Sequence, residues 1–538
     1  MKATLIQKQE IIIGTSAADV EKGCSFLENL LQRYLFPKTV ISETRFVCEA
    51  ILQELADLHS EEELEINLST HYRFGSVLIK IGFEGDIFTP DLESKELSVE
   101  NTILKTYDDR IDYSYLSGYN NITVFVKRSW WRDPVTALLC IALAVAVYVL
   151  LLHFSDETHV TLLFDNVIIP LEKLFANAVL MIGAPVTFLS LLNNLTDLYI
   201  ISERNSEARW LHFRTFASSL IVVLLAVAAA FFFSDYLEGN TKYRIEYSGV
   251  GLAKMISDLL ESIMPSSIFS PFEVTSPFPI IVLSILMTYA LCSSGKYFNA
   301  LKKTIQTGYY LFSRMLAIVV FFLPFFFFIA TLHLFIEYGF KSFGYLLEFI
   351  ALAAVALPPL ILFYLLRLII GRVDLRKFFS GLLTFMKENI TIDSAIDAVP
   401  FNIRYCIREY DMDRKKLEGA LPILAQVNLD GNCYVITLIS VLVLLQNGIY
   451  PKWFEIAMIG ILIFVLSLGA PNQPGSCLIG FTTVLAYLQT YSLLHMVIIS
   501  EVMYGSMINL INVTGDLVTV AIENADRKKA GQPDNTHI

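Results

Sequence analysis

The sequence predicts a polytopic α-helical membrane protein with a small α/β domain at its N-terminus. Of its 538 residues, 55% are hydrophobic and only 17% are charged, and the mean hydropathy is +0.56. Soluble domains are rarely so apolar and so poor in charge. Many stretches beyond residue 134 contain the roughly 20 apolar residues that a membrane-spanning helix needs. Residues 1–126 contain no such stretch and show the periodicities of strands and helices instead.

The N-terminal segment is predicted to be a soluble domain and not a cleaved signal peptide, because it is not apolar. Alternation predicts strands and three-to-four spacing predicts helices. The expected elements are strands 5–14, 63–69, 75–83 and 121–126 and helices 17–36 and 43–58. Residues 1–126 hold 21 acidic and 11 basic side chains, which is −10 of the net charge of −12. So acidic a domain does not suit nucleic acid or an anionic membrane surface.

The membrane part begins after an interfacial linker, KRSWWRDP (127–134), in which basic residues and tryptophans precede the first apolar run. We expect membrane segments at 135–153, 168–200, 212–234, 276–293, 309–336 and 343–370. Residues 371–525 are less regular, because NLDGN (428–432) and GAPNQPG (469–475) interrupt their apolar stretches. Residues 526–538 form a polar tail.

Lysine and arginine predict the orientation of these segments. Alternate loops are basic, whereas the loop 153–167 contains neither residue type. The basic positions include Lys127, Arg128, Arg204, Arg209, Lys296, Lys302, Lys303, Arg372, Arg376, Lys377, Arg527, Lys528 and Lys529. The positive-inside rule therefore predicts that the N-terminal domain and the C-terminus are cytoplasmic. The loop 235–254, which carries three basic residues, is a mild exception.

Polar residues inside apolar stretches are the main functional signal. A charge at mid-membrane costs roughly 2.5–3.5 kcal/mol on insertion scales, so it normally faces a cavity, an ion or a partner. Asn428, Asp430 and Asn432 surround Gly431, and this composition predicts a broken helix. Freed carbonyls beside a carboxylate would make an all-oxygen cation site of the kind found in transporters.

Asn512 and Asp516 are the second part of this signal. Their i, i+4 spacing places them on one face of the last helix. That face is expected to meet the NLDGN break. The alternative is that the asparagines only make hydrogen bonds between helices and that Asp516 is interfacial.

Cysteines and histidines give no metal signal, because the seven cysteines are scattered and are expected to be small buried hydrophobes. His153 and His159 flank one short loop, which is more typical of an interface than of a metal site. No nucleophile–base pair or phosphate loop indicates an enzyme.

Five motifs together resemble the dicarboxylate/amino acid:cation symporters, the glutamate-transporter-like family, over residues 135–525. NLDGN and NVTGD (512–516) resemble the polar motifs of its last two helices. AVPFNIR (398–404) and GAPNQPG resemble its two re-entrant hairpins, and 314–330 resembles its fifth helix. The resemblance implies about eight transmembrane helices, two hairpins, a homotrimer, and movement of the 370–525 part against the 135–300 part.

The resemblance also implies sodium as the coupling ion, with no other cofactor. Asn428, Asn512 and Asp516 would hold one ion. Asn428 and Asp430 would hold a second, with help from the third helix. The expected helpers there are Thr215, Ser218 and Ser219.

The substrate site departs from the family pattern. Gly505 and Ile508 stand where the family has an Asp for the substrate's amino group and an Arg for its carboxylate. Losing a bidentate carboxylate donor is not a conservative change. The other expected substrate positions are Asp393, Ser394, Asp397, Gln473 and Asn509. We therefore expect neither glutamate, aspartate nor a dicarboxylate as substrate.

The N-terminal domain resembles the ATPase-like fold of histidine kinases. Gln53 replaces the magnesium-binding Asn of that fold, and Phe83 replaces its adenine-contacting Asp. ATP hydrolysis is not expected, and the domain is predicted to be a regulatory module or a dock for a cytoplasmic protein.

The sequence thus predicts a sodium-coupled symporter of a small organic solute in a bacterial inner membrane. The alternative is a membrane-anchored sensor built on a transporter-like body.

Overall fold

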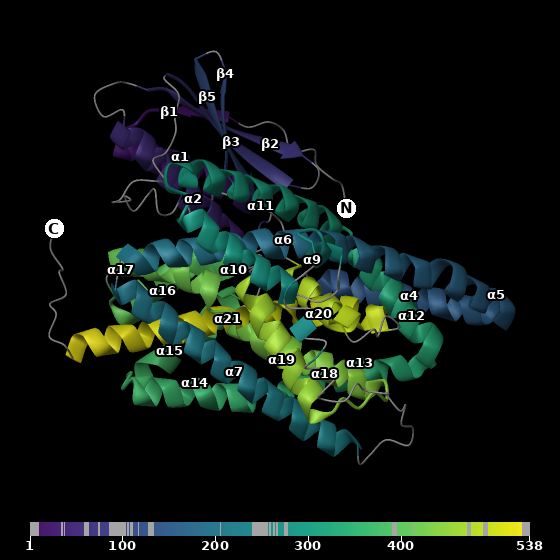
Figure 1. The fold of residues 1–538 in the computed structure, drawn as a ribbon. Helices are drawn as coiled ribbons and strands as arrows, with labels where there is room; N and C mark the ends of the chain where they lie inside the picture. The colour runs from purple at the N-terminus through teal and green to yellow at the C-terminus, as the bar shows by residue number, and fades with distance from the viewer. Residues whose placement is uncertain are drawn as a thin grey trace.

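The computed structural model describes most of residues 10–529. It leaves out 34–35, 37, 59–63, 74–75, 86–103, 105–106, 108–110, 117, 127–133, 205, 239–256, 258–259, 262–263, 265–266, 274–277, 390–394, 413, 471–474 and 488–492. Two parts are visible in Figure 1, a domain with a sheet and a larger helical body.

The N-terminal domain is a five-stranded antiparallel sheet with helices α1 and α2 packed on it. Its elements are β1 Glu10–Ile13, α1 Ala17–Arg33, α2 Lys38–Leu58, β2 Ile66–Arg73, β3 Ser76–Glu84, β4 Ile111–Leu116 and β5 Tyr119–Val126. The strand order is β1-β2-β3-β5-β4. Every predicted element is represented, but β4 was not predicted. Burial raises the pKa of the Cys24 thiol to about 12, so this cysteine acts as a small core hydrophobe.

The first half of the helical body contains long apolar helices. They are α4 Pro134–Phe154, α5 Glu157–Leu163, α6 Ile169–Arg204, α7 Ser206–Glu238, α9 Ser270–Glu273, α10 Phe278–Cys292, α11 Phe298–Phe321, α12 Leu323–Tyr338, α13 Ser342–Ala356 and α14 Pro358–Ile370. A π-helical segment, η2 (Phe164–Ile168), joins α5 to α6. Short 3-10 turns, η3 (Gly295–Tyr297) and η4 (Gly339–Lys341), precede α11 and α13.

Two predicted spans are wrong, because proline divides them. The 309–336 span is split between α11 and α12, with Pro324 in the first turn of α12. The 343–370 span is split into α13 and α14 at Pro358. Proline has no N–H for the preceding turn and its ring clashes with it, so a helix starts there more easily than it continues.

The second half contains two helical hairpins and one very long helix. Its elements are α15 Leu375–Asn389, α16 Ala395–Tyr410, α17 Arg414–Val427, η5 Asn432–Ile436, α18 Thr437–Gln446, α19 Trp453–Leu468, α20 Ser476–Tyr487 and α21 Leu494–Lys529. Helix α15 packs on α16, and α19 packs on α20. The tips of both hairpins lie outside the described residues.

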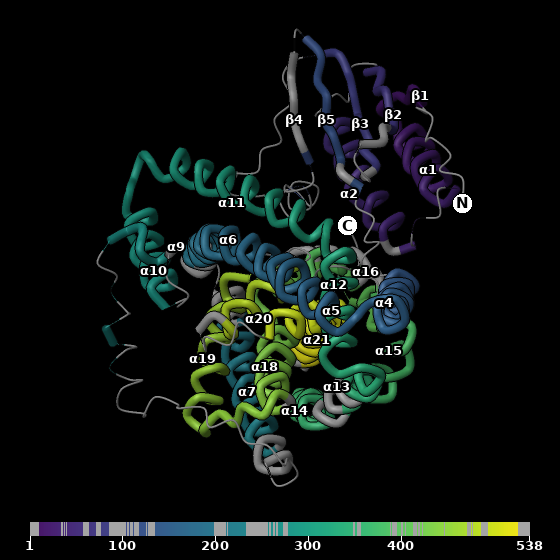
Figure 2. Tube along the Cα trace, turned by 90° about the vertical axis from the view of Figure 1, so that its right-hand side faces the viewer, coloured from purple at the N-terminus to yellow at the C-terminus, as the bar shows by residue number. Residues whose placement is uncertain are grey.

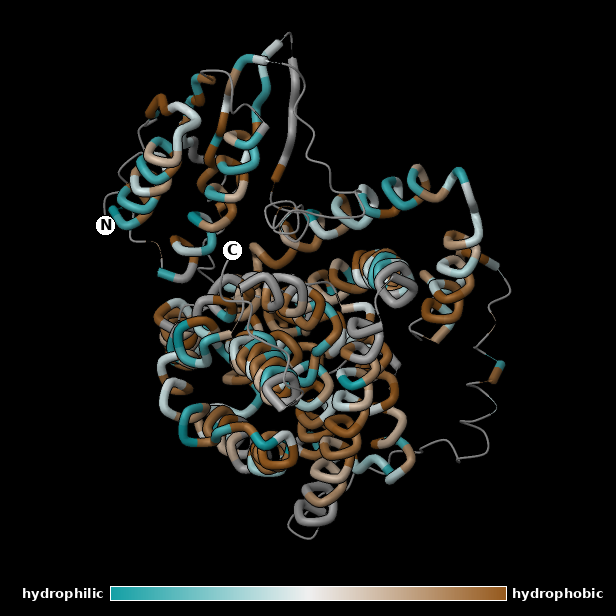
Figure 3. The backbone as a smooth tube through the Cα atoms, turned by 90° about the vertical axis from the view of Figure 1, so that its left-hand side faces the viewer, coloured by the Kyte–Doolittle hydropathy of each residue, from teal (hydrophilic) through white to brown (hydrophobic). Residues whose placement is uncertain are grey.

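Six helices among the described residues are long and apolar enough to cross a membrane, or seven if the pair bent by 110° around residue 293 is one span. In the apolar window of α4 only 6% of the residues are buried, against 94% in the window at Ile423–Leu445. Helix α4 is therefore peripheral, and the broken span lies in the centre. Figure 3 shows long hydrophobic stretches in the body, whereas hydrophobic and hydrophilic residues alternate in the N-terminal domain.

Helix α21 runs through the middle of the body and packs on α12, α14, α16, α17 and α20 (Figures 1 and 2). The N-terminal domain contacts the body at α16, through α2. The buried Tyr107 donates a hydrogen bond of 3.1 Å to the backbone oxygen of Ile396, in the first turn of α16.

Candidate cation site

The NLDGN segment breaks a buried helix, as the sequence predicts. Helix α17 ends at Val427, residues 428–429 are not helical, and the π-helical η5 follows before α18. Asn428 and Asp430 have no exposed surface. π-Helical segments occur frequently at functional sites, because the extra residue displaces the regular backbone hydrogen bonds. The break thus presents polar groups in the centre of the body.

Asn428 and Asp516 form a pair with unused oxygens. The Asn428 Nδ2 donates a hydrogen bond of 2.9 Å to Asp516 Oδ1. The other two oxygens, Asn428 Oδ1 and Asp516 Oδ2, are buried and have no hydrogen-bond partner among the described residues. A buried acceptor without a donor is costly and uncommon. These two unused oxygens, on two side chains joined by a hydrogen bond, could serve as ligands of a cation.

Asp430 differs from Asp516, because both of its oxygens already accept hydrogen bonds. Ser219 Oγ donates to Oδ1 at 2.7 Å, and the Tyr364 hydroxyl donates to Oδ2 at 3.0 Å. Arg367, one turn beyond Tyr364 on α14, acts on the same carboxylate electrostatically. Tyr364 and Arg367 were not predicted from the sequence, although a tyrosine and an arginine inside an apolar run were the available signal.

Asn512 holds α21 against the break. Its Oδ1 accepts a hydrogen bond of 2.7 Å from the Gly431 backbone N–H, and its Nδ2 donates to Asn432 Oδ1 at 2.9 Å. The predicted face of α21 therefore meets the NLDGN segment. Both polar atoms of the Asn512 amide are engaged there, and neither bonds to Asp516.

Two glycines allow this close approach. A Cβ on Gly515 of α21 would lie 2.7 Å from Asn428 Nδ2 and 3.0 Å from both Asp430 Oδ2 and the Tyr364 hydroxyl. The Asn428 amide and the Asp430 carboxylate thus converge beside Gly515. A Cβ on Gly431 would overlap the backbone oxygen of Ile508. We call Asn428, Asp430, Asn512 and Asp516 the oxygen site.

The predicted hydroxyl helpers on α7 are all buried. Ser219 bonds to Asp430, as described above. Thr215 donates to the Leu211 carbonyl in its own helix at 2.9 Å, which leaves its lone pairs for other contacts. The Ser218 hydroxyl has no hydrogen-bond partner among the described residues.

The structure describes only part of the predicted substrate site. Gly505, Ile508 and Asn509 are buried on one stretch of α21. Asp397 belongs to α16, but its side chain is not described. Asp393, Ser394 and Gln473 lie outside the described residues.

A polytopic helical body with polar groups at a central broken helix is the architecture of secondary transporters. Comparison with known families matches residues 136–525 to the sodium:dicarboxylate symporter family. This match covers most of the chain, and the chain belongs to that family. Its members are transporters and not enzymes. No curated protein matches the chain.

Proposed function

We propose that the protein is a sodium-coupled symporter of a small organic solute. The observation that carries this proposal is the pair of buried oxygens without partners, Asn428 Oδ1 and Asp516 Oδ2. They come from two elements and are joined through one hydrogen bond. Membership of the family supports cation-coupled symport, and the all-oxygen donor set supports sodium as the ion.

The charges in the oxygen site favour a monovalent ion. Ser219, Tyr364 and Arg367 already compensate Asp430. The described partner of Asp516 is the neutral amide of Asn428. One negative charge then remains for the ion, and oxygen ligands suit hard cations. A proton on Asp516 would also remove the charge, so sodium and proton must be compared directly.

The substrate is proposed to be neither an acidic amino acid nor a dicarboxylate. Gly505 and Ile508 offer no charge where family members hold the amino group and the distal carboxylate. L-glutamate, L-aspartate and succinate, each with sodium present, should therefore neither raise Tm nor be taken up. Millimolar or tighter binding of any of them contradicts this part of the proposal.

Transport is proposed to proceed by movement of the 371–525 part against the first membrane helices, in a homotrimer of a bacterial inner membrane. The N-terminal domain and the C-terminus are proposed to be cytoplasmic. Protease added to intact spheroplasts should then leave residues 1–126 uncut. Cleavage from outside would reverse the proposed orientation.

The deciding experiment combines a sodium titration of Tm with uptake into proteoliposomes, using potassium and a pH series as controls. A ligand that binds only the folded state raises Tm by mass action. Sodium stabilisation with sodium-driven flux supports symport, and a pH response without a sodium response indicates proton coupling. Stabilisation without flux would favour a sensor. The contact of Tyr107 with α16 is the observation in favour of that alternative.

A further inference from the structure

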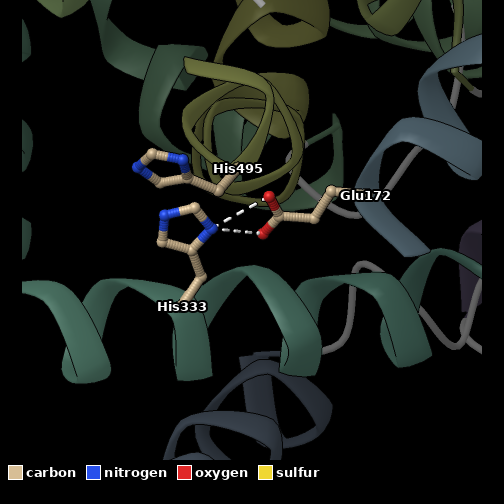
Figure 4. A group of neighbouring side chains, drawn as sticks. All are labelled: Glu172, His333 and His495. Atoms are coloured by element: carbon tan, nitrogen blue, oxygen red, sulfur yellow. Dashed lines mark hydrogen bonds and ion pairs between the residues drawn. The ribbon is translucent and has the colours of Figure 1, made fainter. Parts of the chain in front are cut away.

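A second cluster of ionisable side chains is buried in the body, away from NLDGN. Glu172 of α6, His333 of α12 and His495 of α21 each offer a donor atom, and these atoms all lie within 4.8 Å of one another. His333 Nδ1 lies 2.9 Å from both carboxylate oxygens of Glu172. The His495 ring stacks on the His333 ring, with centroids 3.9 Å apart (Figure 4). We call these three residues the histidine cluster.

The positions of the three side chains follow from rigid elements. Glu172 lies in the first turn of α6, directly after the π-helical η2. Phe164 of η2 packs edge-on against the His333 ring, with centroids 4.7 Å apart. His495 is the second residue of α21. Side chains held by helices and by packing are preorganised for a ligand.

We propose that the histidine cluster binds one divalent transition-metal ion, of which Zn²⁺ is the best representative. Two imidazole nitrogens and one carboxylate oxygen form a known zinc ligand set, with water in the fourth position. Imidazole suits zinc, copper, iron and nickel, whereas magnesium and calcium prefer oxygen alone.

The present distances are compatible with this ion. Ligand bonds of about 2.0–2.1 Å place neighbouring ligands of a tetrahedral zinc roughly 3.3 Å apart. His333 Nδ1 and the Glu172 oxygens, now 2.9 Å apart, therefore have to separate by about 0.4 Å, and His495 has to approach from within the 4.8 Å limit. The His495 ring stacks on the His333 ring, so it has to turn until its nitrogen lone pair points at the ion. The metal takes the place of the proton shared by these two groups, and that proton leaves to solvent.

Glu337 supplies an independent observation. Its Oε2 lies 3.2 Å from His333 Nε2, on the side of the ring opposite to Glu172. A metal-ligating histidine almost always donates its other N–H to a carboxylate, carbonyl or water, which fixes the tautomer. Glu337 is positioned for this role. Its side chain is 42% exposed, which places the cluster one residue from the surface.

Charge balance favours a divalent ion over a proton alone. Glu172 is buried, whereas the Glu337 side chain is 42% exposed, and both contact His333. A protonated His333 can neutralise only one of the two carboxylates. A divalent ion bound by neutral imidazoles and Glu172 neutralises both.

The metal would connect α6 and α12 with α21. Under the proposed transport mechanism, α21 belongs to the moving part, so bound metal would hold the two parts together and inhibit flux. This consequence depends on the proposed function. Metal binding itself does not, and it is measured without transport.

The test uses purified full-length protein, stripped with EDTA and titrated with Zn²⁺ and with Co²⁺. Wild-type protein should bind one equivalent of Zn²⁺, with a rise in Tm of about 2 °C at 100-fold excess over Kd. Co²⁺ should give the visible absorption of a tetrahedral site. His333→Gln and His495→Gln should abolish the Co²⁺ absorption, and Glu337→Gln should weaken binding about 10- to 100-fold.

His153→Gln and His159→Gln are the matched controls, because both histidines are exposed, on α4 and α5, outside the cluster. They should leave the titration unchanged. The melting temperature of each variant without added metal, compared with that of wild type, reports whether it is folded. Wild-type protein without stoichiometric metal, or a Co²⁺ band that persists in His495→Gln, overturns the proposal. A metal-binding protein that transports nothing would overturn only the proposed function.

Discussion

The oxygen site and the histidine cluster are both buried polar groups next to a π-helical segment, yet their donors differ. The oxygen site contains amides and carboxylates from η5, the residues before it and α21. The histidine cluster contains two imidazoles and one carboxylate from α6, α12 and α21. Helix α21 contributes to both, with His495 near its start and Asp516 more than five turns later.

Because of this difference in donor atoms, one scaffold can select a different ion at each of two sites. Oxygen donors around one uncompensated carboxylate suit a monovalent hard cation. Nitrogen donors with two nearby carboxylates suit a divalent ion of the zinc type. Sodium and zinc should therefore each stabilise the protein through one site only, and variants in one site should leave the other response intact.

The largest expected effect comes from the backbone contact that only the oxygen site has. Gly431→Ala should destabilise the protein by about 3 kcal/mol and abolish the sodium response, because the new Cβ overlaps the Ile508 carbonyl. Backbone atoms cannot rotate away as a side chain can. Thermal unfolding with and without sodium measures both effects.

Gly344→Ala is the matched control, since a Cβ there meets nothing within 4 Å. It should leave stability unchanged or slightly higher, as alanine is the better helix former. A Gly431→Ala protein as stable as this control would show that α21 does not approach the break so closely.

Neutralising one carboxylate in each site gives the next largest effect. Asp516→Asn should remove the sodium-induced rise in Tm but leave the protein folded, because the loss of a buried charge also removes its desolvation cost. Glu172→Gln should keep the sodium response and lose the zinc response. Thermal titrations of both variants with both ions give four measurements. Loss of both responses in either variant would mean that the sites are not independent.

Substitution of Asp430 should reduce the sodium response less than substitution of Asp516, because other side chains already compensate the charge of Asp430. Tyr364→Phe removes one hydrogen bond to this buried carboxylate and should cost about 2 kcal/mol. Asp430→Asn should weaken the sodium response without abolishing it. Equal loss of sodium affinity in Asp430→Asn and Asp516→Asn would place the ion between the two carboxylates instead.

The sequence predicts features that depend on one stretch of chain. Helices α4, α6 and α7 follow from uninterrupted apolar runs. The helix break was predicted from NLDGN, but it falls at residues 428–429, and Gly431 itself is helical. The division at Pro324 was missed, because the apolar signal continues across the proline. Strand β4 was missed because IDYSYL is only six residues long, although its isoleucine and two tyrosines favour a strand and alternate with polar residues.

The sites were predicted only in part, for a related reason. Asn512 and Asp516 were found because their helical spacing is local. Tyr364 was missed, because nothing local connects it to Asp430, 66 positions away. The histidine cluster was missed entirely, since Glu172 and His333 are separated by 161 positions. Only the packing of α6, α12 and α21 joins these residues.

The smallest expected effect concerns whether the docking of the N-terminal domain is coupled to the oxygen site. Tyr107 bonds to the first turn of α16, and α16 packs on α17 and α21, which flank the oxygen site. Tyr107→Phe should cost about 1 kcal/mol of docking energy, because one neutral hydrogen bond is lost. The domain should then be cleaved several-fold faster in limited proteolysis, and sodium should protect it less than in wild type. The zinc-induced rise in Tm should stay the same, because the histidine cluster lies on other helices apart from the start of α21.

Tyr119→Phe, a change on an exposed tyrosine of β5, is the control for loss of a hydroxyl in the same domain. Sodium protection equal to wild type in Tyr107→Phe would mean that this contact only anchors the domain, whereas a changed zinc response would mean that the domain reads both sites through α21.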